Sequence, residues 1–186
     1  MIQSQAELEA LFARLRGVPL LAVDTEAASF HRFTDRVYLL QISSREETAV
    51  VDPLAVENLA PLGRVLADPA VETVFHDADY DLRLLDREYG YHASSLFDTR
   101  IAAQLLNEPG VGLAALLEKF ERANRVPFDA LASLVDDTEA RTSIGDTALA
   151  GSVEQLGGMT LVAEDVFALL LLYGQLVAGL GVARVA

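Results

Sequence analysis

The chain is built around the stretch Leu20-Leu21-Ala22-Val23-Asp24-Thr25-Glu26, in which four apolar residues run directly into two carboxylates. The apolar part follows Gly17 and Pro19 and predicts a buried central strand. Residues i and i+2 of a strand point to the same face, so Asp24 and Glu26 are expected side by side, about 6–7 Å apart. Burying two carboxylates together is costly unless a cation lies between them. The stretch therefore suggests a divalent-metal site, with a solvated strand end as the simpler alternative.

The composition indicates one globular domain spanning residues 1–186. Of these residues 52% are hydrophobic and 23% are charged, which is enough apolar material for a sizeable core. There is no cysteine, which excludes disulfides, thiolate catalysis and cysteine-based zinc sites. The N-terminus lacks the basic and apolar regions of a signal peptide, so we expect a cytoplasmic protein.

The net charge is −14, from 14 basic and 28 acidic residues. Such a charge argues against nonspecific coating of nucleic acid. It does not exclude a nucleic-acid enzyme, whose contacts are local and whose metal ions supply positive charge.

The first part of the chain predicts a helix followed by an antiparallel meander. Ser4 and Glu7 have the spacing of a capping box at the start of a helix. Residues 37–42 and 48–51 predict two strands after the one at 20–26. Short connections imply that these three strands are antiparallel neighbours.

Helices and strands alternate further along the chain. The expected elements are a helix over 54–67, a strand over 71–75, a helix over 78–88 capped by Asp77, a short strand at 96–97, a helix capped by Asp98 and a helix over 113–120. The strand at 71–75 follows a helix and should therefore lie parallel to a neighbour. The pattern as a whole indicates an α/β fold with a mixed sheet.

The C-terminal third divides into two segments of different character. Residues 121–160 are acidic, and we expect one short helix near 128–135 within a loose connection. Residues 161–180 are almost wholly apolar, and their length would suffice for a membrane span. Because Glu164 and Asp165 interrupt the run, a buried helix is the better interpretation, and we expect no membrane partner.

Two further acids fall on elements that can meet the strand at 20–26. Asp81 lies in the first turns of one predicted helix, and Asp165 lies near the start of the apolar C-terminal helix. Each alone is explained as an acid favoured near a helix N-terminus. Together with Asp24 and Glu26, they form the oxygen-ligand set that a hard cation prefers.

Several short motifs surround these acids in a fixed order. They are Val23-Asp24-Thr25-Glu26, Leu39-Leu40-Gln41-Ile42, Val51-Asp52-Pro53-Leu54, Val74-Phe75-His76 with Asp81-Leu82, Phe97-Asp98-Thr99 with Ile101-Ala102-Ala103, Gly112-Leu113-Ala114-Ala115-Leu116 and, in part, Ala163-Glu164-Asp165-Val166. The series resembles the ribonuclease D-like members of the DEDD 3′-5′ exonuclease superfamily, which have a ribonuclease H-like fold. The resemblance is dense from Leu20 to Phe120 and returns from Leu161 to Leu180.

The resemblance implies a two-metal mechanism with Mg²⁺ or Mn²⁺ acting on the 3′ ends of single-stranded RNA or DNA. The implied catalytic metal ligands are Asp24, Glu26, Asp81 and Asp165, and the implied substrate contacts are Thr25, Gln41 and His76. One ion would help to activate the attacking water, and the other would stabilise the leaving 3′ oxygen. A purely structural role is an equal alternative for His76, and support of the strand is the alternative for Thr25 and Gln41.

The third motif departs from the family pattern. Family members carry a Tyr four residues before the last Asp, or a His five residues before it, and here these positions are Leu161 and Thr160. A positioned general base contributes about 10²–10⁴ in rate, so weakened activity is expected while metal binding is retained. The family's basic, Trp-containing segment is also missing from residues 121–160, and we expect no additional helical nucleic-acid-binding domain.

Three functions remain open at this point. The first is a metal-dependent 3′-5′ exonuclease that releases nucleoside monophosphates. The second is a catalytically degenerate exonuclease domain that binds nucleic acid or a protein. The third is a metal phosphohydrolase for small phosphoesters, which is less favoured because the chain has no dedicated phosphate loop. RNA and DNA remain equal candidates, and the oligomeric state stays open.

Overall fold

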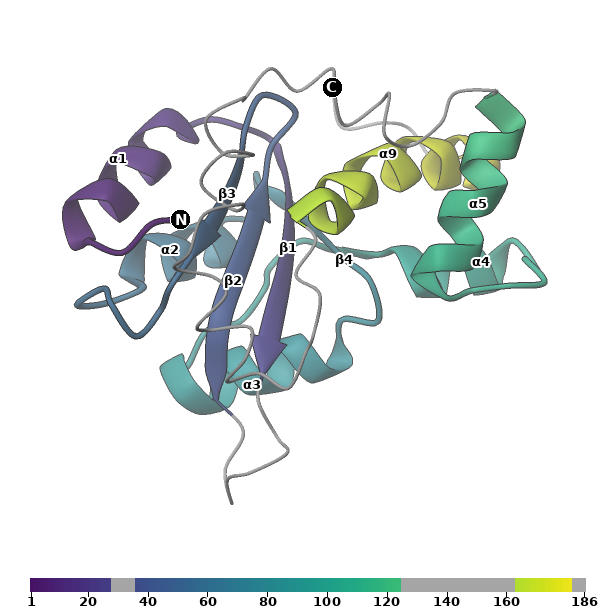
Figure 1. Ribbon diagram of the computed structural model, residues 1–186. Coiled ribbons are helices and arrows are strands. Elements are labelled where there is room, and N and C mark those ends of the chain that lie inside the picture. Colours follow the sequence, from purple (N-terminus) through teal and green to yellow (C-terminus); the bar gives the residue numbers. More distant parts are fainter. Residues whose placement is uncertain (28–35, 125–162, 182–186) are drawn as a thin grey trace, which may run out of the picture.

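The computed structural model describes residues 1–27, 36–124 and 163–181. Within these ranges, five strands form one sheet in the order β3-β2-β1-β4-β5, with β1 at the centre (Figure 1). The strands are β1 (Leu20–Ala27), β2 (Val37–Ser43), β3 (Thr48–Val51), β4 (Glu72–Phe75) and β5 (Leu96–Asp98). The helices are α1 (Gln5–Arg14), α2 (Ala60–Ala67), α3 (Asp79–Tyr89), α4 (Thr99–Leu105), α5 (Leu113–Asn124) and α9 (Ala163–Leu180).

The sheet is mixed, as the sequence predicts. Strand β1 pairs antiparallel with β2, and β2 pairs antiparallel with β3, so the predicted meander is confirmed. Strand β4 lies parallel to both β1 and β5, since a helix precedes each of these parallel additions along the chain. The short strand expected at 96–97 is confirmed as β5.

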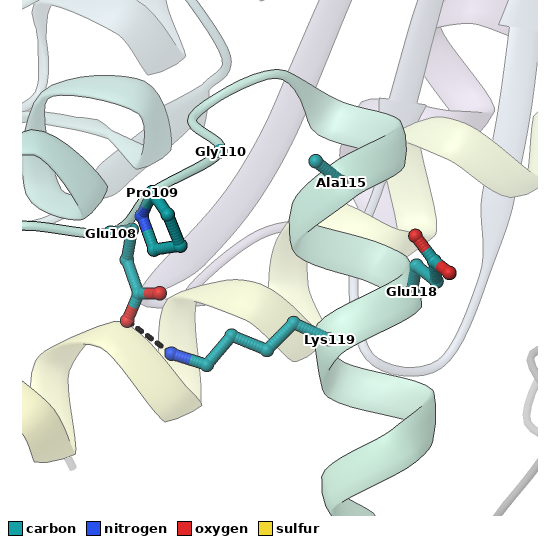
Figure 2. Close-up of a pocket in the computed structure, with 6 residues that line it drawn as sticks. All are labelled: Glu108, Pro109, Gly110, Ala115, Glu118 and Lys119. Atoms are coloured by element: carbon teal, nitrogen blue, oxygen red, sulfur yellow. Dashed lines mark hydrogen bonds and ion pairs between the residues drawn. The ribbon is translucent and has the colours of Figure 1, made fainter.

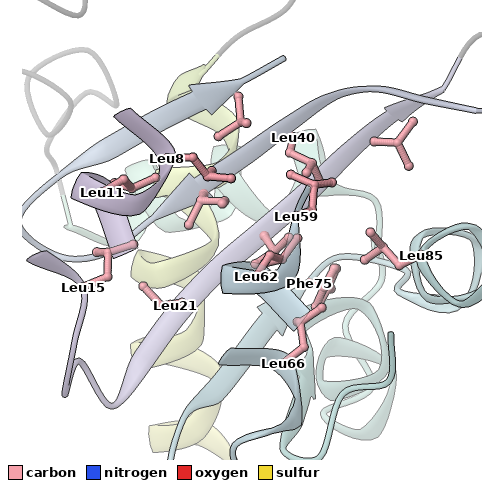
Figure 3. Packing of buried hydrophobic residues seen from close by; sticks show 14 of the residues in the cluster. Leu8, Leu11, Leu15, Leu21, Leu40, Leu59, Leu62, Leu66, Phe75 and Leu85 are labelled. Carbon is pink, nitrogen blue, oxygen red and sulfur yellow. The ribbon is translucent and has the colours of Figure 1, made fainter. Parts of the chain in front are cut away.

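One face of the sheet is covered by α1, α2 and α3. Figure 3 shows the core of this side, in which Leu11 of α1, Leu62 of α2 and Leu85 of α3 are fully buried. They belong to the same cluster as Leu21 of β1 and Phe75 of β4. The central strands therefore supply the floor on which all three helices pack.

The opposite face is covered by α9, with α4 and α5 beside it (Figure 1). Leu169 and Tyr173 of α9 are buried against Ala22 of β1 and Val74 of β4. Further along α9, Leu172 joins a cluster with residues of α4 and α5. The predicted buried C-terminal helix is confirmed, and no helix within the described ranges has the length and apolar character that crossing a bilayer requires.

The helix predicted over 54–67 begins later than expected, at Ala60. The Leu54 N–H donates to the side chain of Asp52 at 2.9 Å, and the Ala60 N–H donates to the side chain of Asn58 at 3.1 Å. Such local side-chain bonds to the backbone compete with helix formation. Pro61 lies in the first turn of this helix, where a missing N–H carries no penalty.

The predicted cap of α3 is also wrong. The helix begins at Asp79 with Ala78 in the cap position, and no side chain of its own segment caps it. Asp77 has a positive φ of 62° and forms an ion pair with Arg100 instead. By contrast, Asp98 caps α4 as predicted. The helix expected near 128–135 lies outside the described residues.

We predict that Leu62→Ala destabilises the domain by about 2–5 kcal/mol, because it removes a fully buried side chain and leaves a cavity. Leu105→Ala is the matched control, since Leu105 is also helical but 67% exposed, and its free energy of unfolding should change by less than about 0.5 kcal/mol. Urea unfolding of both variants measures the difference. An equal loss in the free energy of unfolding of the two variants would contradict the burial of Leu62 in the core.

Candidate active site

Alternation along β1 determines which way each residue at its end projects. Val23 packs in the core on the α1–α2–α3 side, whereas Ala22 packs on the α9 side. With a period of two, Asp24 and Glu26 continue the α9 face, and Thr25 continues the opposite face. Both acids are partly exposed, while Thr25 is buried. The strand therefore presents two neighbouring carboxylates on one side, as the sequence predicts.

Asp81 reaches the end of β1 from α3. It lies in the first turn of this helix, and it is buried. Its Oδ1 accepts a hydrogen bond from the Thr25 N–H at 3.1 Å and a second one from the Thr25 hydroxyl. Strand β4 pairs with β1 only along Leu20–Ala22, so the Thr25 N–H lies beyond that ladder and is satisfied by Asp81 instead.

Burial raises the pKa of Asp81 above its usual value, and the charge of Asp77 adds to the rise. The two hydrogen bonds from Thr25 act in the opposite direction and do not cancel the effect of burial. Burial thus makes the ionised form of this carboxylate unfavourable. A divalent cation beside it would favour the ionised form, so the environment of Asp81 fits a metal ligand.

Gln41 approaches Asp24 from the neighbouring strand. The two residues are partners in the β1–β2 register, and Gln41 Nε2 donates to Asp24 Oδ2 at 3.4 Å. Gln41 is only 2% exposed, and its Oε1 is a buried acceptor without a hydrogen-bond partner in the described part of the chain. A buried unpaired acceptor costs about 1–3 kcal/mol. The buried amide of Gln41 therefore does not stabilise the core, and its role is to orient the Asp24 carboxylate.

His76 lies at the end of β4 and is held by α4. The Thr99 hydroxyl donates to the Phe75 carbonyl at 3.1 Å, so it accepts from His76 Nδ1 at 2.8 Å. This fixes the tautomer with a proton on Nδ1 and leaves Nε2 as an acceptor. Burial lowers the pKa of His76, which favours the neutral ring. The structural role considered for this histidine is thus present.

The structure brings Asp24, Glu26 and Asp81 to the same end of β1. Among the described residues, no three acidic or histidine side chains lie close enough to hold one metal ion together. Asp165 is the third residue of α9, which packs on the face from which Asp24 and Glu26 project. Its side chain lies outside the described part, as do Leu161 and Thr160.

A pocket of about 370 Å³ lies elsewhere, between the α4–α5 connection and α5 (Figure 2). It is lined by Glu108, Pro109, Gly110, Ala115, Glu118 and Lys119. The ammonium group of Lys119 reaches across to form an ion pair with Glu108. None of the predicted site residues lines this pocket, so it is not part of the candidate active site.

Comparison with known proteins agrees with the motifs and the fold. A family model described as 3′-5′ exonuclease matches residues 1–179. The chain belongs to this 3′-5′ exonuclease family. Exosome complex exonuclease RRP6 of Saccharomyces cerevisiae is 37% identical over 120 residues, which make up 64% of this chain and 16% of that protein. The match therefore covers a small part of this relative's length.

Two solved structures are similar to this chain in fold. Escherichia coli RNase D, an exoribonuclease involved in structured RNA processing, matches with a TM-score of 0.72 and 26% identity over 96% of this chain and 44% of that one. Brucella melitensis NrnC with bound Mg²⁺ matches with a TM-score of 0.61 and 23% identity over 90% and 77% of the two chains. The resemblance to ribonuclease D and the ribonuclease H-like fold are thereby confirmed.

The raised pKa of Asp81 predicts a pH-dependent stability. The folded state binds the Asp81 proton more tightly than the unfolded state, so stability is lost as the pH rises through the folded-state pKa. Asp81→Asn keeps an acceptor for Thr25 and removes the charge. In urea unfolding with EDTA, this variant should gain stability over the wild type progressively as the pH rises above the ordinary aspartate pKa of about 4.

The control for this experiment is Asp79→Asn, since Asp79 lies in the same helical turn but is exposed and paired with Arg83. This variant should show no growing advantage over the wild type as the pH rises. A difference between Asp81→Asn and the wild type that is independent of pH would contradict the role of burial.

Proposed function

We propose that this domain is a divalent-metal-dependent 3′-5′ exonuclease that releases nucleoside monophosphates from the 3′ ends of single-stranded nucleic acid. The observation that carries the proposal is the contact of Asp81 with Thr25, the residue between Asp24 and Glu26 at the end of the central strand, in a chain of this family. The buried environment of Asp81 supports a cation at this place, because a positive charge offsets the cost of burying the carboxylate.

In this proposal, Asp24, Glu26 and Asp81 hold the metal ions, and Asp165 completes the set from α9. When bound, two Mg²⁺ or Mn²⁺ ions would activate the attacking water and stabilise the leaving 3′ oxygen. The Mg²⁺ bound to NrnC supports this choice of metal. An all-carboxylate ligand set also suits these hard cations better than softer metals.

The other predicted site residues divide by exposure. Thr25 is 8% exposed and Gln41 is 2% exposed, so each presents little surface to a nucleotide. We assign them to the support of Asp81 and Asp24, respectively. His76 is less deeply buried, and its Nε2 is free of the bond that holds Nδ1, so it keeps the assignment of a contact to the substrate.

RNA is the favoured substrate, with DNA as the second. This preference follows from the relatives, because RNase D is an exoribonuclease and RRP6 is an exosome exonuclease. The net charge of −14 gives the domain no general attraction for either polymer. Recognition would therefore depend on the metal ions and on contacts at the 3′ terminus.

The first test is a nuclease assay on matched RNA and DNA oligonucleotides with Mg²⁺, Mn²⁺ or EDTA. Activity should require the metal, and Asp24→Asn or Asp81→Asn should lower kcat by at least about 10²-fold, because each removes a charge that holds the cations. Asp79→Asn, an exposed change in the same turn of α3, should retain wild-type activity. Wild-type protein that cleaves no single-stranded substrate with Mn²⁺ would refute the proposal.

A degenerate domain that binds nucleic acid or a protein without turnover is the second candidate. It is favoured by Leu161 and Thr160, which stand where the family places a Tyr or a His. Leu161→Tyr separates the two candidates. If the wild type is a weakened enzyme, this variant should gain about 10²–10⁴ in rate.

Leu161→Phe is the control, because it adds the ring without the hydroxyl and should bring no gain. Single-turnover product release measures both variants. Wild type and Leu161→Tyr that are equally inactive, while still binding an oligonucleotide, would support the degenerate domain instead.

A further inference from the structure

The carboxylate of Asp98 binds backbone groups from two separate segments. Its Oδ1 accepts from the N–H of Arg100 at 2.8 Å and of Ile101 at 3.2 Å, which caps α4. The same oxygen accepts from the Asp77 N–H at 3.2 Å, and Oδ2 accepts from the Ala78 N–H at 2.8 Å. One side chain thus serves both the start of α4 and the turn that leads into α3.

The turn before α3 depends on this contribution from outside. Ala78 occupies the cap position of α3 and has no side chain that can accept a hydrogen bond. Asp77 has a positive φ of 62°, which is unfavourable for a residue other than glycine. The ion pair between Asp77 and Arg100 adds a second link between the same two turns. The conformation of the turn is therefore set by Asp98 at the end of β5 and Arg100 in the first turn of α4.

A third link between the same segments is made by Thr99, which lies between Asp98 and Arg100. The Thr99 hydroxyl, which is fully buried, donates to the Phe75 carbonyl and accepts from His76. The residues Asp98, Thr99 and Arg100 consequently hold the whole connection from the end of β4 to the start of α3.

We infer that Asp98 is a positioning residue for the candidate active site, because it fixes the start of α3 and thereby Asp81. Asp81 is the third residue after Ala78 and contacts Thr25 within the first turn of the helix. A small shift of this turn changes where the Asp81 carboxylate lies relative to the end of β1. For its effect on catalysis, the inference rests on the proposed exonuclease function.

Asp98→Asn tests the link without abolishing the cap of α4. Asparagine caps helices as well as aspartate does, so an amide oxygen in place of Oδ1 keeps the bonds to α4. The amide nitrogen then replaces Oδ2 and cannot accept from the Ala78 N–H. Asp98→Ser is the second variant, since a serine hydroxyl also caps α4 but is too short to serve both segments.

The control is Ser4→Ala, which removes the cap of α1 on another part of the fold. Loss of a helix cap lowers the stability of the folded state, so this variant matches the general loss of stability. All proteins are compared at the same pH in metal-free buffer by amide hydrogen exchange and then by titration with Mn²⁺. The diagnostic amide is Thr25, because it donates to Asp81.

In Asp98→Asn, the Thr25 amide should exchange at least about 10-fold faster than in Ser4→Ala, while the amides of the β1–β2 ladder stay alike in both. Affinity for Mn²⁺ should fall by about 10–100-fold, as expected for a residue that orients a metal ligand. Equal protection of Thr25 in both variants would overturn the inference. A wild type that binds no Mn²⁺ would refute the proposed function, whereas the exchange of Thr25 would still test the role of Asp98.

Discussion

The hydrogen bonds from Thr25 to Asp81 join helix α3 to the end of the central strand, and the candidate active site depends on them. They arise because β1 is twice as long as β4, with eight residues against four. The last part of β1 therefore has no strand partner on that side, and its backbone must be satisfied in another way. The Asp81 carboxylate does so and brings a negative charge to the end of β1.

The topology explains why this end of the sheet is available for chemistry. From β1, the chain builds β2 and β3 on one side and β4 and β5 on the other. In open α/β sheets, ligands bind outside the carboxyl ends of strands where successive connections leave in opposite directions. Asp24 and Glu26 stand at such a point. In the proposed function, a metal at this place takes its ligands from the central strand, from α3 and from α9.

Much of this arrangement could be predicted from local patterns, and the rest could not. The apolar run over residues 20–23, followed by Asp24, indicates a buried strand that ends in a carboxylate, and the order of the motifs suggested Asp81 as a partner. The double role of Asp98 has no local signal, because Ala78 lies 20 residues away and contributes only a backbone N–H. The failed prediction for Asp77 has the same origin. An acid before a helix is predicted to cap it, but here the distant Asp98 already accepts from the N–H groups of the turn.

The acidic character of the domain is consistent with the proposed function once the site is considered by itself. A domain with a net charge of −14 repels a polyanion at long range. The carboxylates that add to this repulsion are also the ligands that would hold divalent cations. Burial makes the ionised form of Asp81 unfavourable unless a cation lies beside it. Two divalent ions would neutralise the four carboxylates that are proposed to hold them and leave the rest of the surface repulsive. Such a charge distribution disfavours binding along the length of a nucleic-acid chain and favours contact with its terminus. Removal of nucleotides from a 3′ end requires contact of this kind.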